Sequence, residues 1–280
     1  MNFENNKKVI QQTIDFALKE DIGSGDITSQ LIIPKDLIIN ADILIKETGI
    51  LAGIEVAKQV FRTIDPNIKF TTLLKDGSKI NKGDIAAHIS GNAINILSAE
   101  RTALNFLQRM SGIATMTNSI CRKIQGTKTK ILDTRKTAPG LRLFDKWAVS
   151  LGGGQNHRFG LYDMILIKSN HIRISKSIAN AVRKAKSKNP KHLLIEIEVS
   201  DLQQLKEALS TGVDVIMLDN MGIDEIRQAV KTVNGKVKLE ISGGVNENNV
   251  AELAKTGVDY ISIGALTHSP KALDLSLKIY

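Results

Sequence analysis

Apolar and polar positions follow two rhythms along the chain, and the second half has the clearer one. From residue 130 onward, short apolar runs alternate with segments whose apolar residues recur every three or four positions. The runs predict strands at 130–132, 164–167, 193–197, 213–218, 237–241 and 260–263, and the segments predict helices at 175–188, 202–209, 223–233 and 247–255. Such alternation implies parallel strands with right-handed crossovers. The period of about 22 residues from Leu194 onward favours a closed or nearly closed β/α barrel over a doubly wound sheet.

The first half predicts a mixed layer of helices and short strands. Apolar residues share one helical face over 9–18, and a second helix is expected at 53–64. A strand is expected at 38–46, and turn residues on both sides of 79–81 favour further short strands in this part of the chain. A long helix is expected at 94–124, with Gly112 as a candidate break. No long linker separates the halves, so closely packed domains are expected.

Composition is that of an ordinary soluble globular protein. The chain has 280 residues, a mass of 30.6 kDa, 42% hydrophobic and 24% charged residues, which is too apolar for intrinsic disorder. Its single cysteine, Cys121, excludes an internal disulfide and a cysteine-rich zinc site, and predicts a reducing, cytoplasmic location. No apolar run is long enough to span a bilayer, and Glu4 and Asp15 interrupt the N-terminal stretch, which excludes a secretory signal.

Basic residues are concentrated in one segment. The formal net charge is +9, yet residues 101–191 hold 19 Lys and Arg against three acids and so carry +16, while the rest of the chain carries −7. A nucleic-acid surface, a basic active site and a set of solvated basic helices all fit this distribution. Charge alone leaves the three open.

Polar residues or glycines directly follow the predicted strands. In a β/α barrel these positions share the face where catalytic groups gather. A single such Asp is an ordinary helix N-cap, and a single such Lys is an ordinary solvated side chain. Six strand ends of this kind in succession make a shared site the better hypothesis. They carry Arg135 with Lys136, Lys168, Glu198, Asp219, Ser242-Gly243-Gly244 and Gly264.

Glycines and carboxylates at these ends suit a phosphorylated ligand. Gly243-Gly244, before a helix expected from about Asn246, lets backbone N–H groups approach an anion, and Gly264 offers a second such loop. Glu198 and Asp219 are able to hold Mg²⁺ or to pair with basic neighbours. The residues alone do not choose between these two roles.

The most unusual local string is Gly152-Gly153-Gly154-Gln155-Asn156-His157-Arg158, inside the basic segment. Flexible backbone beside His157 and Arg158 suits wrapping around an anion, and arginine offers a planar fork to carboxylate or phosphate. The chain has no Ser/His/Asp order and no HExxH, Walker A or GxGxxG pattern. Covalent acyl chemistry, zinc hydrolysis and dinucleotide binding are therefore unsupported.

Taken together, these strings resemble the quinolinate phosphoribosyltransferases, a family of type II phosphoribosyltransferases, over nearly the whole chain. The matching strings are Glu20-Asp21, Gly25-Asp26-Ile27-Thr28, Glu47-Thr48-Gly49-Ile50-Leu51-Ala52-Gly53, Ala99-Glu100-Arg101-Thr102, Asp133-Thr134-Arg135-Lys136-Thr137, Pro139-Gly140-Leu141-Arg142, the glycine string at 152–158, Lys168-Ser169-Asn170-His171, Glu196-Ile197-Glu198-Val199, Leu218-Asp219-Asn220, Ser242-Gly243-Gly244 and Gly264-Ala265-Leu266-Thr267-His268. They are long, specific and in order along the chain.

The resemblance implies an α/β fold, with an N-terminal α/β sandwich domain over 1–112 and a C-terminal β/α barrel-like domain with parallel strands over 113–268. A last helix is expected at about 269–280, packed on one of these domains. The implied enzyme is a glycosyltransferase (pentosyltransferase), nicotinate-nucleotide diphosphorylase (carboxylating). With Mg²⁺ it would join quinolinate to 5-phosphoribosyl 1-diphosphate, and give nicotinate mononucleotide, diphosphate and CO₂ in de novo NAD biosynthesis. A homodimer, or a hexamer of three dimers, is implied as well.

Site residues follow from the resemblance by motif position. The expected substrate-binding residues are Arg101 (from the partner subunit), Arg135, Lys136, His157, Arg158 and Lys168 around quinolinate, Glu198 and Asp219 on the metal and the ribose hydroxyls, and Ser242, Gly243, Gly244 and Gly264 around the 5-phosphate. The expected catalytic residues are Lys168, Glu198 and Asp219, with Lys168 either stabilising or protonating the carbanion that decarboxylation leaves.

Two alternatives stay open at the level of sequence. One is a sibling phosphoribosyltransferase or a pyrophosphorylase-like protein that acts on another anionic substrate, although the number of basic candidates favours a substrate with two carboxylates. The other is a nucleic-acid-binding protein, which the pI of about 9.5 favours. An aromatic content of 4% and the lack of a binding motif argue against it. The basicity is better explained by a cavity for small, highly anionic substrates, with no membrane partner.

Overall fold

The computed structural model describes residues 3–189 and 191–280. The chain divides into two compact units. The first unit comprises Met1–Asn118, Ala138–Gly153 and Leu266–Tyr280, and the second comprises Ser119–Thr137 and Gly154–Ala265. Within the described residues, no helix is both long enough and apolar enough to cross a membrane.

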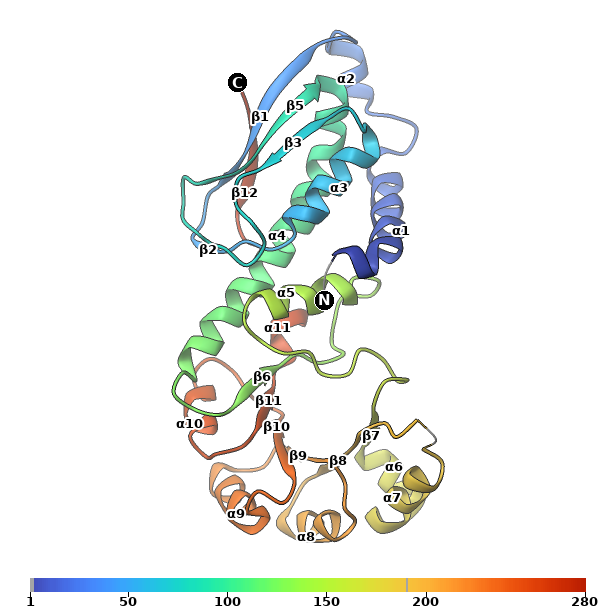
Figure 1. Cartoon of the computed structure of the whole chain (residues 1–280), viewed down its shortest axis with the longest axis vertical. Coiled ribbons are helices and arrows are strands. Elements are labelled where there is room, and N and C mark those ends of the chain that lie inside the picture. Colours follow the sequence, from blue (N-terminus) through green and yellow to red (C-terminus); the bar gives the residue numbers. More distant parts are fainter. Residues whose placement is uncertain (1–2, 190) are drawn as a thin grey trace. The chain divides into compact units, whose positions relative to one another are not determined.

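The first unit is built on an antiparallel sheet of four strands in the order β12-β1-β5-β3. Helices α3 and α4 run beside this sheet, and α1 packs against α3 (Figure 1). The helices are α1 (Phe3–Ile22), α2 (Ile27–Ile32), α3 (Ile54–Ile64), α4 (Ala93–Lys123), α5 (Arg142–Leu151) and the short α11 (Ala265–His268). The strands are β1 (Ile38–Ile45), β2 (Gly49–Ile50), β3 (Lys69–Thr72), β4 (Lys79–Ile80), β5 (Ile85–Asn92) and β12 (Leu275–Ile279).

Helix α4 is continuous, so the candidate break at Gly112 is wrong. A Cβ at Gly112 would lie 2.1 Å from the carbonyl oxygen of Lys271, which shows that the glycine is needed for close packing against another segment of the first unit. Because the helix is unbroken, the sequence-based domain boundary between residues 112 and 113 lies inside it.

The C-terminal segment is a strand and not the expected helix at 269–280. It follows α11 and pairs antiparallel with β1, with Ala41 opposite Ile279 and Ile45 opposite Leu275. Leu275, the first residue of the strand, is buried. The partner strand lies more than 200 residues earlier, so no local pattern announces this pairing.

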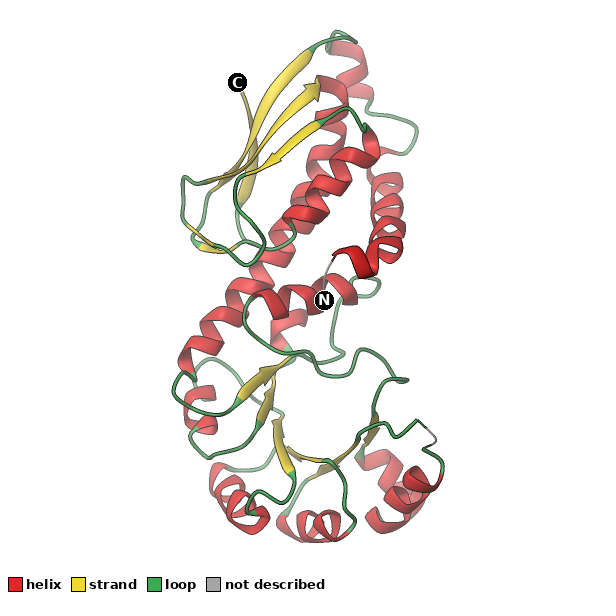
Figure 2. Ribbon diagram, in the orientation of Figure 1, coloured by secondary structure: helices red, strands yellow, loops and turns green. Residues whose placement is uncertain are grey.

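The second unit is a parallel sheet of six strands in the order β6-β11-β10-β9-β8-β7. The strands follow one another around an arc, with helices on its outer side (Figure 2), so the predicted barrel-like arrangement is confirmed. The strands are β6 (Lys130–Leu132), β7 (Ile165–Ile167), β8 (Ile195–Val199), β9 (Val215–Asp219), β10 (Lys238–Ser242) and β11 (Tyr260–Ser262). The helices are α6 (Ser169–Ser175), α7 (Ile178–Ser187), α8 (Leu202–Ser210), α9 (Ile223–Val233) and α10 (Val250–Ala254).

Two neighbours of the central strand β9, namely β8 and β10, alternate between apolar and polar residues. In β8, Ile195, Ile197 and Val199 alternate with Glu196 and Glu198. Strands buried on both faces usually read as continuous apolar runs. The alternation therefore gives the sheet one apolar face, which the helices cover, and one face that carries the polar side chains.

Candidate active site

The polar face of the parallel sheet is set by strand register. Glu198 lies level with Met217, and Ser242 lies level with Asp219. Since residues two apart on a strand point to the same side, Glu198, Asp219 and Ser242 share one face at the carboxyl ends of their strands. Glu240 is level with Met217 and Glu198, and Glu196 precedes Glu198 by two residues, so both lie on this same face, and both are buried.

Lys168 and Glu198 form an ion pair at the carboxyl ends of β7 and β8. The Lys168 Nζ lies 3.7 Å from Glu198 Oε2, and the lysine side chain is 50% exposed. The N–H of Ser169 also donates to Glu198 Oε1, over a long 3.4 Å. Exposed pairs of this length contribute little stability, so both groups are available to a ligand.

Asp219 is oriented by its neighbour in sequence. Asn220 has a left-handed backbone with φ 54°, and its side-chain amide donates to Asp219 Oδ2 at 3.1 Å. The Asn220 N–H donates to the carbonyl oxygen of Ser242 at 2.9 Å. A Cβ at Gly243 would lie 2.2 Å from Asn220 Oδ1 at a φ of 92°, so a larger residue there would be strained and would displace the Asn220 side chain. The acidic end of β9 and the glycine loop after β10 are thus one packed arrangement.

The glycine loop exposes its backbone amides. Gly243 and Gly244 have φ of 92° and 63°, and in the described part of the chain their N–H groups donate to no protein acceptor. They line a cavity of about 340 Å³. The helix expected from about Asn246 begins instead at Val250, because Asn246 and Asn249 hold the loop in a turn through their side chains. The amides of the loop, and not an adjacent helix terminus, are what it offers to an anion.

The basic loop before β7 is organised by one buried acid. Asp133 is fully buried and accepts from the backbone N–H of His157 at 2.9 Å and the side-chain amide of Asn156 at 2.6 Å. Burial, and then the positive charge of Arg135, lower the pKa of Arg158 below its usual range. Two guanidinium groups near one another repel each other, and one of them is partly desolvated. A bound anion would reduce this repulsion.

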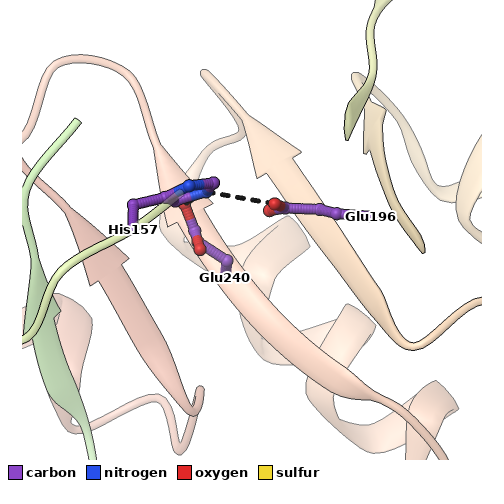
Figure 3. A group of neighbouring side chains, drawn as sticks. All are labelled: His157, Glu196 and Glu240. Carbon is purple, nitrogen blue, oxygen red and sulfur yellow. Dashed lines mark ion pairs between the residues drawn. The ribbon is translucent and has the colours of Figure 1, made fainter. Parts of the chain in front are cut away.

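His157, Glu196 and Glu240 form a buried cluster (Figure 3). The His157 Nε2 lies 3.0 Å from Glu196 Oε2 and 3.6 Å from Glu240 Oε1, with side-chain exposures of 8%, 1% and 2%. The other ring nitrogen, Nδ1, accepts the backbone N–H of Arg158 at 2.7 Å. Both nitrogens of His157, an expected ligand of quinolinate, thus have protein partners.

Sequence reasoning did not single out Glu196 and Glu240 as functional candidates. The signal was present, because each is the only charged residue between two apolar residues, in Ile195-Glu196-Ile197 and Leu239-Glu240-Ile241. On a strand, that spacing puts them on the same face as Glu198 and Ser242.

The second unit contains most of the expected site residues, which come from its strand ends and loops. They are Arg135, Lys136, His157, Arg158, Lys168, Glu198, Asp219, Ser242, Gly243, Gly244 and Gly264. Arg101 is the exception, because it is an exposed residue on α4 of the first unit.

Family models match almost the whole chain. The model of the quinolinate phosphoribosyl transferase N-terminal domain matches residues 26–111, and that of the C-terminal domain matches residues 113–278. The probable nicotinate-nucleotide pyrophosphorylase (carboxylating) of Bacillus subtilis strain 168 is 44% identical over 270 residues, which cover 96% of this chain and 93% of that protein. The chloroplastic nicotinate-nucleotide pyrophosphorylase (carboxylating) of Arabidopsis thaliana is also 44% identical, over 96% of this chain and 82% of its own.

Solved structures agree with these relatives. The nicotinate-nucleotide pyrophosphorylase of Francisella tularensis superposes with a TM-score of 0.94 at 45% identity, over 98% of this chain and 96% of that chain. Human nicotinic acid phosphoribosyltransferase has a TM-score of 0.65 at 12% identity, over 96% of this chain and 73% of that chain, which is a likeness of fold alone.

Proposed function

Because the chain belongs to the quinolinate phosphoribosyltransferase family, we propose that it transfers the 5-phosphoribosyl group from 5-phosphoribosyl 1-diphosphate to quinolinate. The products are nicotinate mononucleotide, diphosphate and CO₂, which makes the chain a decarboxylating pentosyltransferase of de novo NAD biosynthesis. The single cysteine supports a cytoplasmic location for this enzyme.

The observation that carries the proposal is the pair of Arg135 and Arg158. Two neighbouring guanidinium groups suit a ligand with two adjacent carboxylates, and each is able to bind a carboxylate through two parallel hydrogen bonds. Lys136 adds positive charge beside them, and Arg101 is proposed to add one more from the partner subunit. Nicotinate, with a single carboxylate, would offer this group of positive charges only one carboxylate to bind.

The phosphoribosyl donor suits the other end of the polar face. The free amides of Gly243 and Gly244, with Ser242 and Gly264, are proposed to hold the 5-phosphate. Glu198 and Asp219 are proposed to hold the ribose hydroxyls and Mg²⁺. Their donor set fits this hard cation, because both offer carboxylate oxygens from neighbouring strands and Glu198 is held only by long contacts. Bound there, Mg²⁺ would neutralise charge on the leaving diphosphate.

Residues of the chain then act mainly by orientation and charge. The pyridine nitrogen of quinolinate forms a bond to ribose C1 as the bond from C1 to diphosphate breaks, and the electron pair leaves with diphosphate. The ribose in this transition state carries cationic character, which nearby carboxylates such as Asp219 and Glu198 stabilise.

Decarboxylation follows at ring C2. The bond from C2 to its carboxylate breaks, CO₂ leaves, and the electron pair stays on C2 beside the cationic ring nitrogen. The Lys168 ammonium is proposed to stabilise this pair or to give it a proton. Its position after β7, half exposed and only 3.7 Å from Glu198, supports this role.

A homodimer, alone or as part of a hexamer, is the proposed assembly. The first unit exposes large apolar side chains at Phe16, Ile27, Leu31 and Ile32, which are 67–79% exposed. Phe16 also lines a cavity of about 660 Å³ together with Thr102, the neighbour of Arg101. Mixing Arg101→Ala and Lys168→Ala subunits tests the shared site, because mixed dimers would regain one intact site and so regain activity.

The proposed function is tested by CO₂ release. The protein is incubated with carboxyl-labelled quinolinate, 5-phosphoribosyl 1-diphosphate and Mg²⁺, and labelled CO₂ and nicotinate mononucleotide are measured. Nicotinate in place of quinolinate is the control for a sibling activity. Turnover of nicotinate without release of CO₂ from quinolinate would replace the proposal by that sibling function.

A further inference from the structure

We propose that Glu196 and Glu240 are positioning residues that fix the tautomer of His157 and, through it, the backbone of Arg158. This inference rests on the proposed function, which assigns the Arg158 guanidinium to quinolinate. It gives His157 a role that acts through its neighbour in sequence and needs no direct contact with substrate.

The tautomer follows from the two partners of the imidazole ring. The Arg158 N–H donates to Nδ1 at 2.7 Å, so Nδ1 carries a lone pair and no proton. A neutral ring then has its proton on Nε2, which faces Glu196 Oε2 at 3.0 Å. The carboxylate thus selects the one tautomer that accepts the Arg158 N–H.

Two acids and a histidine within 4.8 Å also resemble a metal site. A metal on Nε2 would displace the proton there, and the neutral ring would then carry its proton on Nδ1. Nδ1 would then be a donor facing the Arg158 N–H, which is also a donor. The hydrogen bond to Arg158 therefore favours a shared proton over a bound cation.

The two buried carboxyls complete the arrangement. In the described residues, Glu196 Oε1 and Glu240 Oε1 have no hydrogen-bond partner if both acids are ionised. Burial, and then the charge of Glu196, raise the pKa of Glu240 to about 8, which keeps it protonated at neutral pH. A neutral Glu240 donates its proton to ionised Glu196, and this hydrogen bond satisfies the orphaned oxygens. The remaining charge on Glu196 also stabilises the nearby Arg158 cation.

Loop geometry links this cluster to the substrate. Asp133 holds the backbone N–H of His157, and the His157 ring holds the backbone N–H of Arg158. Two successive amides of a loop that follows three glycines are therefore fixed by side chains. A small shift of Arg158 would weaken its contact with a carboxylate, which is how residues behind a binding group act on affinity.

The experiment compares variants that keep or remove the relevant hydrogen bonds. Glu240→Gln replaces the neutral acid with a neutral amide that still donates to Glu196, whereas Glu240→Ala removes the donor. His157→Asn keeps an acceptor near the Nδ1 position, whereas His157→Ala removes it. Asp224→Asn changes an acid that is 83% exposed on α9 of the same unit and serves as the matched control.

We expect Glu240→Ala and His157→Ala to raise the KM for quinolinate by roughly ten- to a hundredfold, by analogy with the loss that follows removal of residues that orient metal ligands. In these two variants the KM for 5-phosphoribosyl 1-diphosphate should stay at the wild-type value. In the control variant Asp224→Asn, both KM values and the thermal midpoint of unfolding should stay at the wild-type values. Glu240→Gln and His157→Asn should recover most of the loss. Equal effects of Glu240→Gln and Glu240→Ala, or an equal rise of KM for both substrates, would overturn the proposal.

A second measurement needs no turnover. The ¹⁵N shifts of histidine-labelled protein at pH 7 report the tautomer of each ring, and His157→Asn assigns the His157 signal. We expect the Nε2–H tautomer in the wild type. In Glu240→Ala we expect ¹⁵N shifts that correspond to a mixture of the two tautomers. An Nδ1–H ring, or a stoichiometric zinc ion bound by the wild type and lost in Glu240→Ala, would contradict the inference. If the wild type shows the Nε2–H tautomer but releases no CO₂, the proposed function and the assignment of Arg158 to quinolinate would fail. The inference about the His157 tautomer would stand.

Discussion

Each unit of this protein pairs an acid on a strand with a histidine, and the two pairs differ in their surroundings. In the first unit, Asp42 on β1 contacts His88 on β5 with 2.5 Å between Oδ1 and Nδ1, and the His88 side chain is 45% exposed. In the second unit, Glu196 contacts His157 at 3.0 Å, and the two side chains are only 1% and 8% exposed. Strand alternation places each acid on a defined face, but what covers that face decides whether the pair is a weak surface contact or a rigid support.

The largest effect is expected from Lys168→Ala, at the edge of the buried face. Loss of the ammonium should lower the rate of CO₂ release by roughly a hundredfold or more, the usual contribution of a positioned proton donor. The measurement is labelled CO₂ release at saturating substrates. Release near the wild-type rate would remove Lys168 from the decarboxylation step.

Gly243→Ala should have the next largest effect. Its Cβ would lie 2.2 Å from Asn220 Oδ1 at a φ of 92°, so the loop is strained and the Asn220 side chain, which donates to Asp219, must shift. The KM for 5-phosphoribosyl 1-diphosphate should rise by about tenfold or more, because the displaced loop would lose backbone hydrogen bonds to the 5-phosphate that it is proposed to hold.

Gly83→Ala is the matched substitution in the first unit. It has a φ of 98° and nothing within 4 Å of the added Cβ. It should cost only about 1 kcal/mol of stability and leave both KM values unchanged. A similar change of KM in the two variants would show that Gly243 acts through general stability.

Glu196→Ala and Asp42→Ala compare the two acid–histidine pairs directly. Loss of the buried acid should lower the free energy of unfolding by about 3 to 5 kcal/mol, because it leaves the His157 Nε2–H and the Glu240 carboxyl buried without this hydrogen-bond partner. Loss of the exposed pair should cost less than about 1 kcal/mol. Urea unfolding of the two variants checks this ranking, and equal losses would contradict the comparison.

Asp76 extends the comparison to an acid buried in the first unit. It caps α3 by accepting the N–H groups of Gly53 and Ile54, and burial raises its pKa from 3.8 to about 6. Below pH 3.8 the carboxyl is protonated in both the folded and the unfolded state. As the pH rises from 3.8 to about 6, the unfolded chain ionises first, so the free energy of unfolding should fall by up to about 3 kcal/mol.

Asp76→Asn isolates this titration. The amide oxygen still accepts from both N–H groups of α3, but it carries no charge, so the fall in stability between pH 4 and pH 6 should shrink by about the same amount. Stability measured by urea unfolding across this pH range is the readout. An unchanged slope would assign the pH dependence to other carboxyls.

Local pattern predicted the second unit better than the first. Helix α9 lies at the predicted 223–233, and all six predicted strands are present, because each βα repeat is encoded within about 20 residues. Where a contact spans a long stretch of sequence, local pattern failed. Gly112 is a candidate helix break by local pattern, but it is required by the close approach of the Lys271 carbonyl. The segment of β12 is expected to be a helix by local pattern, which does not reveal the pairing with the remote strand β1.

By itself, the sequence determined the family, the parallel order of the second unit and the strand ends at which chemistry gathers, because these depend on local periodicity and on contiguous strings. Only the tertiary structure decided how those ends work together. The proximity of Arg135 and Arg158, the orientation of Asp219 by Asn220 and the tautomer of His157 depend on groups that meet from different strands and loops. Their charges and hydrogen bonds depend on burial, and burial is produced by the packing of segments that are distant in the sequence.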